Sequence, residues 1–254
     1  LSSARVTFML TKITSSSLFQ LTVLVLTLLV FFVIRTYRLN FPLADWHSWR
    51  QADTAAVARN FVQDQFNLLY PQSDSLWALS EKQLPNPNRY FMNEFPLYNA
   101  SVALIYKLTG TINPAYGRLV SISISTLGAY FLYLLVKTLL GFPVAIMSLL
   151  YYTLLPYNIY YSRVFMPDPS FAALSIITLY YCVRYSTTTL LRDGIVMSLT
   201  FALATLVKPY ALFMSIPMLY WLYTTQGRVI FRGKRNYFLF TLAVVPLLLW
   251  RFHL

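Results

Sequence analysis

The sequence predicts an all-α polytopic membrane protein with about seven transmembrane helices and a long outer first loop that carries amphipathic juxtamembrane helices. Hydrophobic residue types make up 57% of the 254 residues, and charged types make up only 11%. Soluble domains carry about 25% charged residues, so this chain has too few to cover a surface that faces water. Aromatic residues, at 17%, suit a protein whose rings lie at the lipid–water interface. A cytosolic globular enzyme, a disordered linker and a coiled coil are therefore excluded.

Seven apolar segments are candidates to cross the membrane, because a spanning helix needs about 20 mostly apolar residues. The first, at residues 18–34, follows Arg5 and Lys12. No small-residue cleavage site comes after it, so we expect a retained anchor rather than a removed signal peptide. The other six candidates are residues 119–136, 144–162, 170–183, 194–207, 210–225 and 237–250.

The distribution of charge assigns the two sides of the membrane. If the seven spans alternate, one side receives residues 1–17, 137–143, 184–193 and 226–236, which hold nine Lys or Arg residues and a single acid, Asp193. Such an excess of basic residues is typical of cytoplasmic loops. The other seven acids lie on the outer side, together with Arg50, Arg163 and Lys208 near predicted helix ends. Charge at membrane depth costs about 2.5–3.5 kcal/mol and usually marks a site, so we expect an outward-facing polar cavity.

The first outer loop is far longer than a usual connection, and long loops in compact proteins tend to be functional. Residues 54–66 predict an amphipathic helix whose cap is Asp53 or Thr54. Residues 70–89 are rich in Pro, Ser, Asn and Gln and are predicted to be irregular. Residues 95–108 form a second apolar segment, which we expect to lie at the membrane interface rather than to cross it.

The segment Asp-Trp-His-Ser-Trp-Arg-Gln-Ala-Asp, residues 45–53, closely follows the first span. Asp45 or Asp53 could act as a general base, and Arg50 could bind an anion between them. The structural alternative is an interfacial aromatic belt with Asp53 as a helix cap, and both interpretations stay open. His47 alone is more often a surface histidine than a ligand.

Four further polar residues lie on the predicted outer side. Glu94 directly precedes the second apolar segment, Arg163 and Asp168 share a turn between two spans, and Lys208 joins two apolar runs. Helix capping would explain Glu94, a salt bridge with a cap would explain Arg163 and Asp168, and snorkelling would explain Lys208. Basic residues are disfavoured on the outer side, so the position of Lys208 favours a functional role.

The sequence lacks several common catalytic motifs. It has no glycine loop that cradles phosphate, no paired cysteines, no HExxH and no nucleophile-elbow serine. Its single cysteine, Cys182, lies inside an apolar run, so a disulfide framework or a cysteine metal cluster is excluded.

Several short motifs follow one another in an informative order. The outer loop contains Thr-Ala-Ala-Val-Ala-Arg-Asn-Phe at 54–61 and Glu-Phe-Pro-Leu-Tyr at 94–98, and Gly-Arg-Leu-Val-Ser at 117–121 opens the next span. Pro-Tyr-Asn-Ile-Tyr-Tyr-Ser-Arg at 156–163, with Asp168, and Leu-Val-Lys-Pro at 206–209 come later. Taken in order, these motifs cover nearly the whole chain. The sequence thereby resembles the C-type integral-membrane glycosyltransferases, and within them the protein O-mannosyltransferase and aminoarabinose-transferase-like group.

The resemblance implies that a hexosyl or pentosyl group passes from a polyprenyl-phosphate donor to an acceptor on the outer or lumenal face, without a nucleotide sugar. It implies Asp53 or Asp45 as the catalytic base, with Asp53 slightly preferred, and Glu94 as the acid of the second loop motif. Two departures stand out in the printed sequence: Arg50-Gln51 replaces the family's Asp-Glu pair, and Phe95 replaces a lysine. A single base and no covalent intermediate would give inversion at the sugar.

For the remaining site residues, the resemblance implies roles for Arg163, Asp168 and Lys208, whereas the residue types at 45–53 suggest roles for Arg50 and His47. Lys208, Arg50 and Arg163 are expected to bind the donor phosphate, and His47 and Asp168 are expected to line the cavity. A divalent cation could bind through Asp53, Glu94 or His47, although no ligand spacing requires one, and no other cofactor is expected.

The expected partners are the polyprenyl-phosphate sugar donor, membrane lipids and an acceptor that is a protein, a lipid or a glycan; nucleic acid is not expected. We expect a multi-pass protein of a bacterial inner (plasma) membrane rather than of the endoplasmic reticulum. Residues 1–254 would form one transmembrane domain, with the outer loop at 37–117, as the N-terminal part of a longer family architecture.

The main alternative is a polytopic transporter or flippase of lipid-linked sugars, and a second is a structural membrane subunit. Charges along several spans would favour a transporter. Here the charges cluster at the outer helix ends, which favours catalysis on a lipid head group, and the lack of evident internal repeats argues against many transporter folds.

Overall fold

The computed structural model describes residues 16–76 and 85–254, and in these ranges the regular structure is helical. Strand pairing there is limited to one antiparallel bridge between Gln72 and Tyr90. The elements are α2 (Ser17–Arg35), α3 (Ser48–Gln63), α4 (Leu97–Thr109), α5 (Pro114–Leu140), α6 (Phe142–Leu154), α7 (Pro156–Tyr161), α8 (Asp168–Thr188), α9 (Leu191–Val207), η1 (Pro209–Met214), α10 (Ser215–Gln226), η2 (Gly227–Phe231) and α11 (Lys234–His253). The all-α prediction is confirmed.

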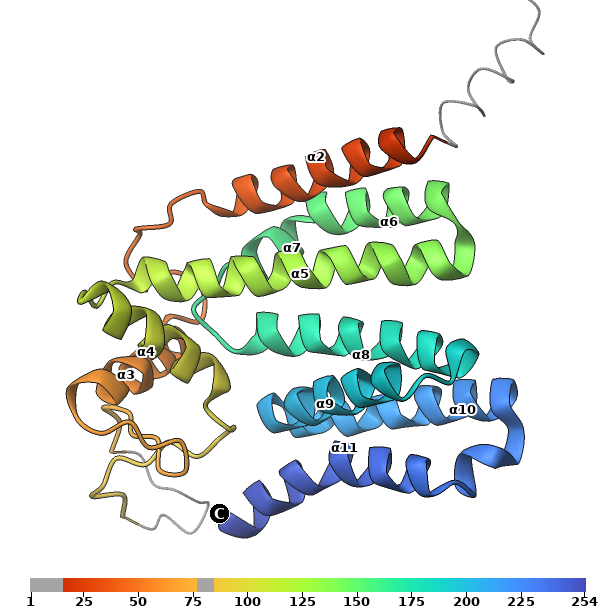
Figure 1. Cartoon of the computed structure of the whole chain (residues 1–254). Coiled ribbons are helices and arrows are strands. Elements are labelled where there is room, and N and C mark those ends of the chain that lie inside the picture. Colours follow the sequence, from red (N-terminus) through yellow and green to blue (C-terminus); the bar gives the residue numbers. More distant parts are fainter. Residues whose placement is uncertain (1–15, 77–84) are drawn as a thin grey trace, which may run out of the picture.

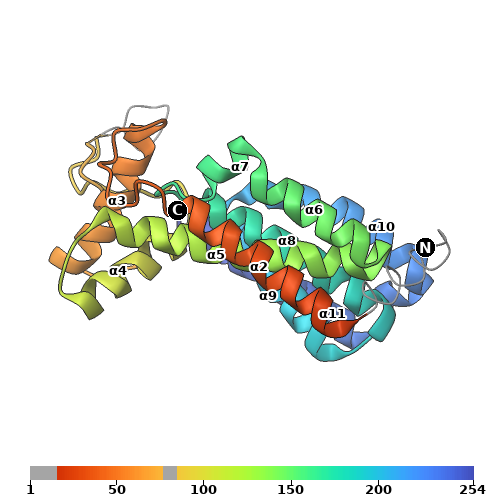
Figure 2. The ribbon, with the colours of Figure 1, turned by 90° about the horizontal axis from the view of Figure 1, so that it is seen from above.

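The longer helices lie side by side in the order α2, α6, α5, α8, α9 and α11, and α10 packs against α8 (Figure 1). The helices α3 and α4 lie together at one end of this bundle, which we call the loop end (Figures 1 and 2). The junction from α7 to α8 and the end of α9 reach the same end (Figure 1). Residues that are far apart in the sequence can therefore meet there.

Three helices in the described ranges are long and apolar enough to cross a membrane, namely α2, α5 and α11, and α6 is a shorter apolar helix. The apolar side chains of α2 explain how it would contact lipid: Leu18, Leu21, Leu26 and Val33 are each more than half exposed. An exposed apolar stripe of this kind is unfavourable in water and favourable in a bilayer. Residues 1–15 of the predicted cytoplasmic segment at 1–17 lie outside the described residues.

Two predicted spans are interrupted. The segment at 144–162 divides at Pro156, where Leu155 adopts an extended conformation (φ −61°, ψ 117°) and separates α6 from α7. Proline lacks the N–H that would continue the helix, and the residue before it avoids the helical region. The segment at 210–225 divides into the 3₁₀ helix η1 and α10.

The predicted amphipathic helix begins earlier than expected. It starts at Ser48, with His47 at the N-cap, so the expectation that Asp53 or Thr54 caps it is wrong. The first turn is stabilised by tertiary contacts of the buried Gln51, which sequence periodicity does not reveal. The apolar segment at 95–108 forms α4, which begins at Leu97, and its place at the membrane interface stays a prediction.

The α3–α4 pair packs on the bundle through a small buried core. Ala58, Tyr98, Val102 and Phe165 belong to this core, and Phe165 comes from the junction between α7 and α8. A Cβ atom on Gly117 would overlap the Phe165 ring, so glycine at this position lets the ring lie directly against α5. This contact ties the loop end to the start of α8.

Candidate active site

The turn that precedes α4 is fixed against the end of α9. The backbone N–H of Phe95 donates to the carbonyl oxygen of Leu206 at 3.1 Å, which holds Glu94 beside the last turn of α9. The Glu94 side chain is only 8% exposed. A carboxylate buried to this extent requires charged or hydrogen-bonding partners.

Glu94 has a cation at each of its carboxylate oxygens. Arg50 Nη2, from the first turn of α3, donates to Glu94 Oε1. Lys208 Nζ, from the residue after α9, lies 3.4 Å from Glu94 Oε2. Lys208 Nζ also lies 3.6 Å from Oδ1 of Asp168, the first residue of α8. The fold thus brings together Arg50, Glu94, Lys208 and Asp168, which we call the charged cluster.

Arg50, Glu94 and Lys208 are largely shielded from water, whereas the Asp168 side chain is 34% exposed. Arg50 and Lys208 are 11% and 16% exposed, and the Arg50 guanidinium lies 5.1 Å from the centre of the Phe91 ring. Burial raises the pKa of the Glu94 carboxyl, and the two neighbouring cations oppose that rise. The Oδ2 atom of Asp168 is buried and has no hydrogen-bond partner among the described residues. Fixed charges in such a water-poor site act on an anion more strongly than they would in water.

A cavity of about 790 Å³ adjoins the charged cluster. Its lining includes Trp49, Asp53, Asp74, Tyr90, Phe91 and Asn93. Two of these residues link it to the charged cluster, because Phe91 contacts Arg50 and Asn93 directly precedes Glu94. The pKa of the Asp53 carboxyl is raised by burial, is lowered in part by Arg50, and is raised further by Asp74. The cavity thus has two carboxylates on its wall, Asp53 and Asp74, and the Arg50 guanidinium beside it.

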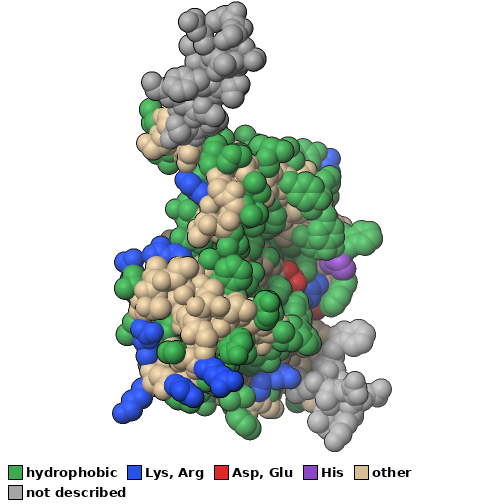
Figure 3. Space-filling model, turned by 90° about the vertical axis from the view of Figure 1, so that its right-hand side faces the viewer, with side chains coloured by type: hydrophobic (Ala, Val, Ile, Leu, Met, Phe, Trp, Pro, Cys, Tyr) green, Lys and Arg blue, Asp and Glu red, His purple; other side chains and the backbone are tan. Residues whose placement is uncertain are grey.

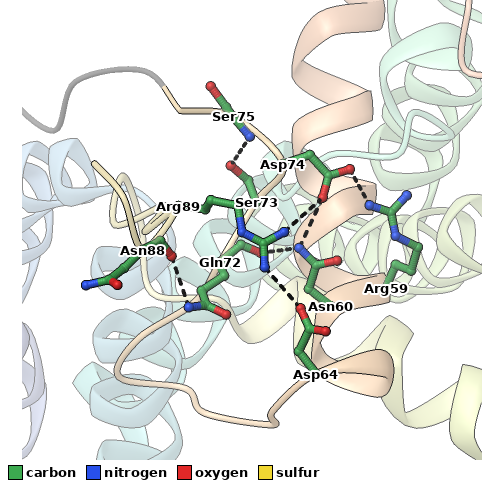
Figure 4. Close-up of polar contacts among 9 residues, drawn as sticks. All are labelled: Arg59, Asn60, Asp64, Gln72, Ser73, Asp74, Ser75, Asn88 and Arg89. Atoms are coloured by element: carbon green, nitrogen blue, oxygen red, sulfur yellow. Dashed lines mark hydrogen bonds and ion pairs between the residues drawn. The ribbon is translucent and has the colours of Figure 1, made fainter. Parts of the chain in front are cut away.

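The part of the cavity lining around Asp74 is held by charged contacts (Figure 4). Arg59 of α3 forms an ion pair with Asp74, and Arg89 lies 3.3 Å from Asp64 and 4.0 Å from Asp74. The Asn60 amide also donates to the Gln72 carbonyl at 3.0 Å. The arginine pairs hold the pKa of Asp74 below its usual value. These contacts tie the otherwise irregular chain around residue 74 to α3.

Asp53 lines the cavity, and the three other sequence-predicted site residues lie apart from both the cavity lining and the charged cluster. Asp45 Oδ1 accepts a hydrogen bond of 2.5 Å from Gln51 Nε2. Arg163 donates to the carbonyl oxygen of Tyr37, and no salt bridge joins it to Asp168 among the described contacts. His47, at the start of α3, has a left-handed backbone (φ 58°), and its ring centre lies 6.2 Å from that of Tyr161.

Sequence reasoning missed two buried polar residues that position this end of the molecule. Gln51 is fully buried, and its Oε1 atom accepts the Phe165 backbone N–H at 3.0 Å while its Nε2 atom binds Asp45. Arg118 is 1% exposed and donates to three carbonyl oxygens within one short stretch of loop backbone. The acceptors are the carbonyl oxygens of Leu39 at 2.8 Å, Phe41 and Pro42 at 3.2 Å. For Arg118, the available signal was its position in the Gly-Arg-Leu-Val-Ser motif at the start of an apolar helix.

Figure 3 shows acidic and basic side chains gathered in a hollow of a mainly hydrophobic surface, with a histidine at its edge. Within residues 16–76 and 85–254, no three His, Cys, Asp or Glu side chains gather closely enough to hold a metal ion. Of the three residues proposed for a divalent cation, Glu94 is paired with Arg50 and Lys208 instead.

Comparison with known proteins assigns the chain to a family. A sequence model of the dolichyl-phosphate-mannose-protein mannosyltransferase family matches residues 93–250, more than half of the chain. The match includes Glu94, Asp168 and Lys208, whereas Arg50 and Asp53 precede it. No curated protein and no solved structure matches the chain. The resemblance inferred from the ordered motifs is confirmed: the chain belongs to the dolichyl-phosphate-mannose-protein mannosyltransferase family and is a multi-pass integral membrane glycosyltransferase that uses a polyprenyl-phosphate-sugar donor.

Proposed function

We propose that this enzyme transfers a sugar from its polyprenyl-phosphate donor, with inversion, on the outer or lumenal face of the membrane. The observation that carries the proposal is the charged cluster beside the cavity at the loop end. The placement of the charged cluster on the outer side is supported by the excess of basic residues in the segments predicted to face the cytoplasm. A polar site at the outer helix ends can reach a lipid head group while the lipid tail stays beside apolar helices.

The proposal includes seven membrane crossings. Beside the three candidate spans α2, α5 and α11, we assign α6, α8, α9 and α10 to this role, because they run alongside them in the bundle (Figure 1). In this arrangement the whole chain acts as one transmembrane domain, and residues 37–117 form the outer loop. We further propose a bacterial plasma membrane rather than the endoplasmic reticulum as its location.

We assign the donor phosphate to Lys208 and Arg50. Both cations are largely buried and directed toward one point, occupied in this structure by the Glu94 carboxylate. Arginine suits this role because its guanidinium offers several donors, and lysine contributes a compact charge. As the bond to the sugar breaks, the leaving phosphate gains negative charge, and these fixed cations would stabilise it. Arg163 lies apart from this pair and is a weaker candidate for the same role.

We assign the catalytic base to Asp53, which lines the cavity. An acceptor hydroxyl must lose its proton as it attacks the sugar, and a positioned carboxylate typically accelerates such a step about 10²–10⁴-fold. Asp45 is the second candidate, but its carboxylate is already bound by Gln51. Attack assisted by one base, without a covalent intermediate, would invert the configuration at the anomeric carbon.

The deciding experiment incubates membranes that contain this chain with a panel of radiolabelled polyprenyl-phosphate sugars, for wild type and Asp53→Asn. We expect one sugar to be transferred to endogenous protein, lipid or glycan acceptors, and transfer to fall at least about 100-fold in the variant. Right-side-out and inverted vesicles then test the face, since transfer to an impermeant acceptor should occur only from the outer side. Transfer that is equal in the variant and the wild type would remove Asp53 from this role.

A further inference from the structure

The Glu94 carboxylate lies between the two buried cations of the charged cluster. Its two oxygens contact different cations, Oε1 with Arg50 and Oε2 with Lys208 at 3.4 Å. Neither cation is more than 16% exposed. The carboxylate is therefore an internal anion that stands between the two groups best suited to hold a phosphate.

The chemistry of the donor makes this position significant. A polyprenyl-phosphate sugar is a phosphodiester, which carries one negative charge shared by two free oxygens, as a carboxylate does. Two anions of similar shape and charge cannot both take the best contacts of one cation pair. With Asp168 also in contact with Lys208, the charged cluster already contains two cations and two carboxylates.

We propose that Glu94 occupies the donor-phosphate position in the unliganded enzyme and gives up its contacts with Arg50 and Lys208 when the donor binds. This inference rests on the proposed phosphate role of Lys208 and Arg50. Glu94 is then a positioning residue that keeps the two buried cations in place and sets the affinity for the lipid phosphate. After transfer, the released lipid phosphate is a monoester with greater negative charge, and the nearby carboxylate favours its departure.

The alternative is that Glu94 only orders the two cations and never competes with the donor. The two roles predict opposite effects for Glu94→Gln. Loss of a competing charge should tighten binding of a polyprenyl phosphate, whereas loss of an ordering charge should weaken it. Glu94→Asp retains the charge and should remain close to wild type in affinity under the competition mechanism.

The experiment measures the dissociation constant of a short-chain polyprenyl phosphate for the full chain purified in detergent micelles. Under competition, Glu94→Gln should bind about tenfold more tightly than wild type, the scale expected for the release of one charge-assisted contact. Steady-state assays with the donor should then show a lower KM together with a lower kcat, because the product leaves more slowly. Asp193→Asn is the matched control, since it removes the same charge from another buried carboxylate with two cations, Arg184 at 3.3 Å and Arg192 at 3.6 Å, at the opposite end of α9 from Lys208.

Lys208→Ala separates this inference from the proposed function. If wild type and Lys208→Ala bind the lipid phosphate equally, the phosphate site itself is misassigned. If Lys208→Ala weakens binding but Glu94→Gln leaves it unchanged or weakens it, the competition mechanism is wrong and the phosphate site stands. Should Glu94→Gln fail to fold, difference infrared spectroscopy on wild type decides: donor binding should shift a carboxylate band, and an unshifted carboxylate region would overturn the inference.

Discussion

The Oε2 atom of Glu94 lies 3.4 Å from Nζ of Lys208, although 113 residues, from 95 to 207, separate the two in the sequence. The contact depends on two features of the backbone. The N–H of Phe95 binds the Leu206 carbonyl, which aligns the turn before α4 with the end of α9. Pro209 then follows Lys208 and ends the α-helical hydrogen bonding, so the lysine leaves α9 with an extended backbone.

Lys208→Ala should impair use of the donor more than use of the acceptor. The lysine is one of two cations assigned to the donor phosphate, and loss of one charge-assisted contact corresponds to about a tenfold to hundredfold rise in the donor KM. Initial rates measured while one substrate is varied at a time will check this. Lys137→Ala is the control, because that lysine lies in the last turn of α5, at the end of the helix far from the loop end, and contacts Gln20. An equal rise in both KM values would argue against a phosphate role.

Replacement of the two candidate bases should separate them. Asp53→Asn should lower kcat at least about 100-fold, whereas Asp45→Asn should act mainly on stability through its contact with Gln51. Transfer rates and thermal unfolding in detergent distinguish the two effects. A large loss of kcat in Asp45→Asn, with Asp53→Asn active, would reverse the assignment.

The pH dependence offers an independent check on Asp53. Burial and Asp74 raise the pKa of its carboxyl, against the influence of Arg50. The base must be ionised, so kcat/KM should fall as the pH drops through this raised pKa, at a higher pH than for an ordinary aspartate. Lowering the positive charge next to it with Arg50→Gln should move this acid limb to still higher pH. If the acid limb is unchanged in Arg50→Gln, the limb does not report the ionisation of Asp53.

The sequence predicted the class of fold and much of the site because both leave strong local signals. Apolar segments revealed the bundle, and charges at helix ends pointed to Glu94, Asp168 and Lys208, which do meet. The start of α3 could not be predicted from periodicity, since it depends on the contacts of Gln51 with Asp45 and the Phe165 backbone.

The pairing of the charges was also beyond sequence reasoning. Arg163 and Asp168 are five residues apart, yet Asp168 pairs with Lys208, and Arg163 binds the Tyr37 carbonyl. The reason is geometric. Asp168 is the first residue of α8, which packs along α9, the helix that ends just before Lys208. Arg163 lies just after α7 and contacts the chain that follows α2.

Arg118→Ala should destabilise the loop end without a direct effect on catalytic groups. The guanidinium donates to the backbone carbonyls of Leu39, Phe41 and Pro42, and its loss leaves these acceptors without their donor. The free energy of unfolding should fall by about 1–3 kcal/mol. Arg118→Lys should recover only part of this, because an ammonium cannot span three carbonyls as a guanidinium does. Unfolding in detergent, followed by tryptophan fluorescence, provides the measurement.

Gln51→Glu should create a like-charge pair inside the loop end. Gln51 Nε2 lies 2.5 Å from Asp45 Oδ1 and is fully buried, so a carboxylate there would face another carboxylate. One of the two must keep a proton, which raises its folded-state pKa above the unfolded value. The variant should therefore match wild type in stability most closely at low pH and lose stability as the pH rises from the unfolded pKa to the raised folded pKa. Thermal unfolding across this range, with the exposed Gln63→Glu as the control, will test it; a pH profile parallel to that of the control would contradict the buried pairing of Gln51 with Asp45.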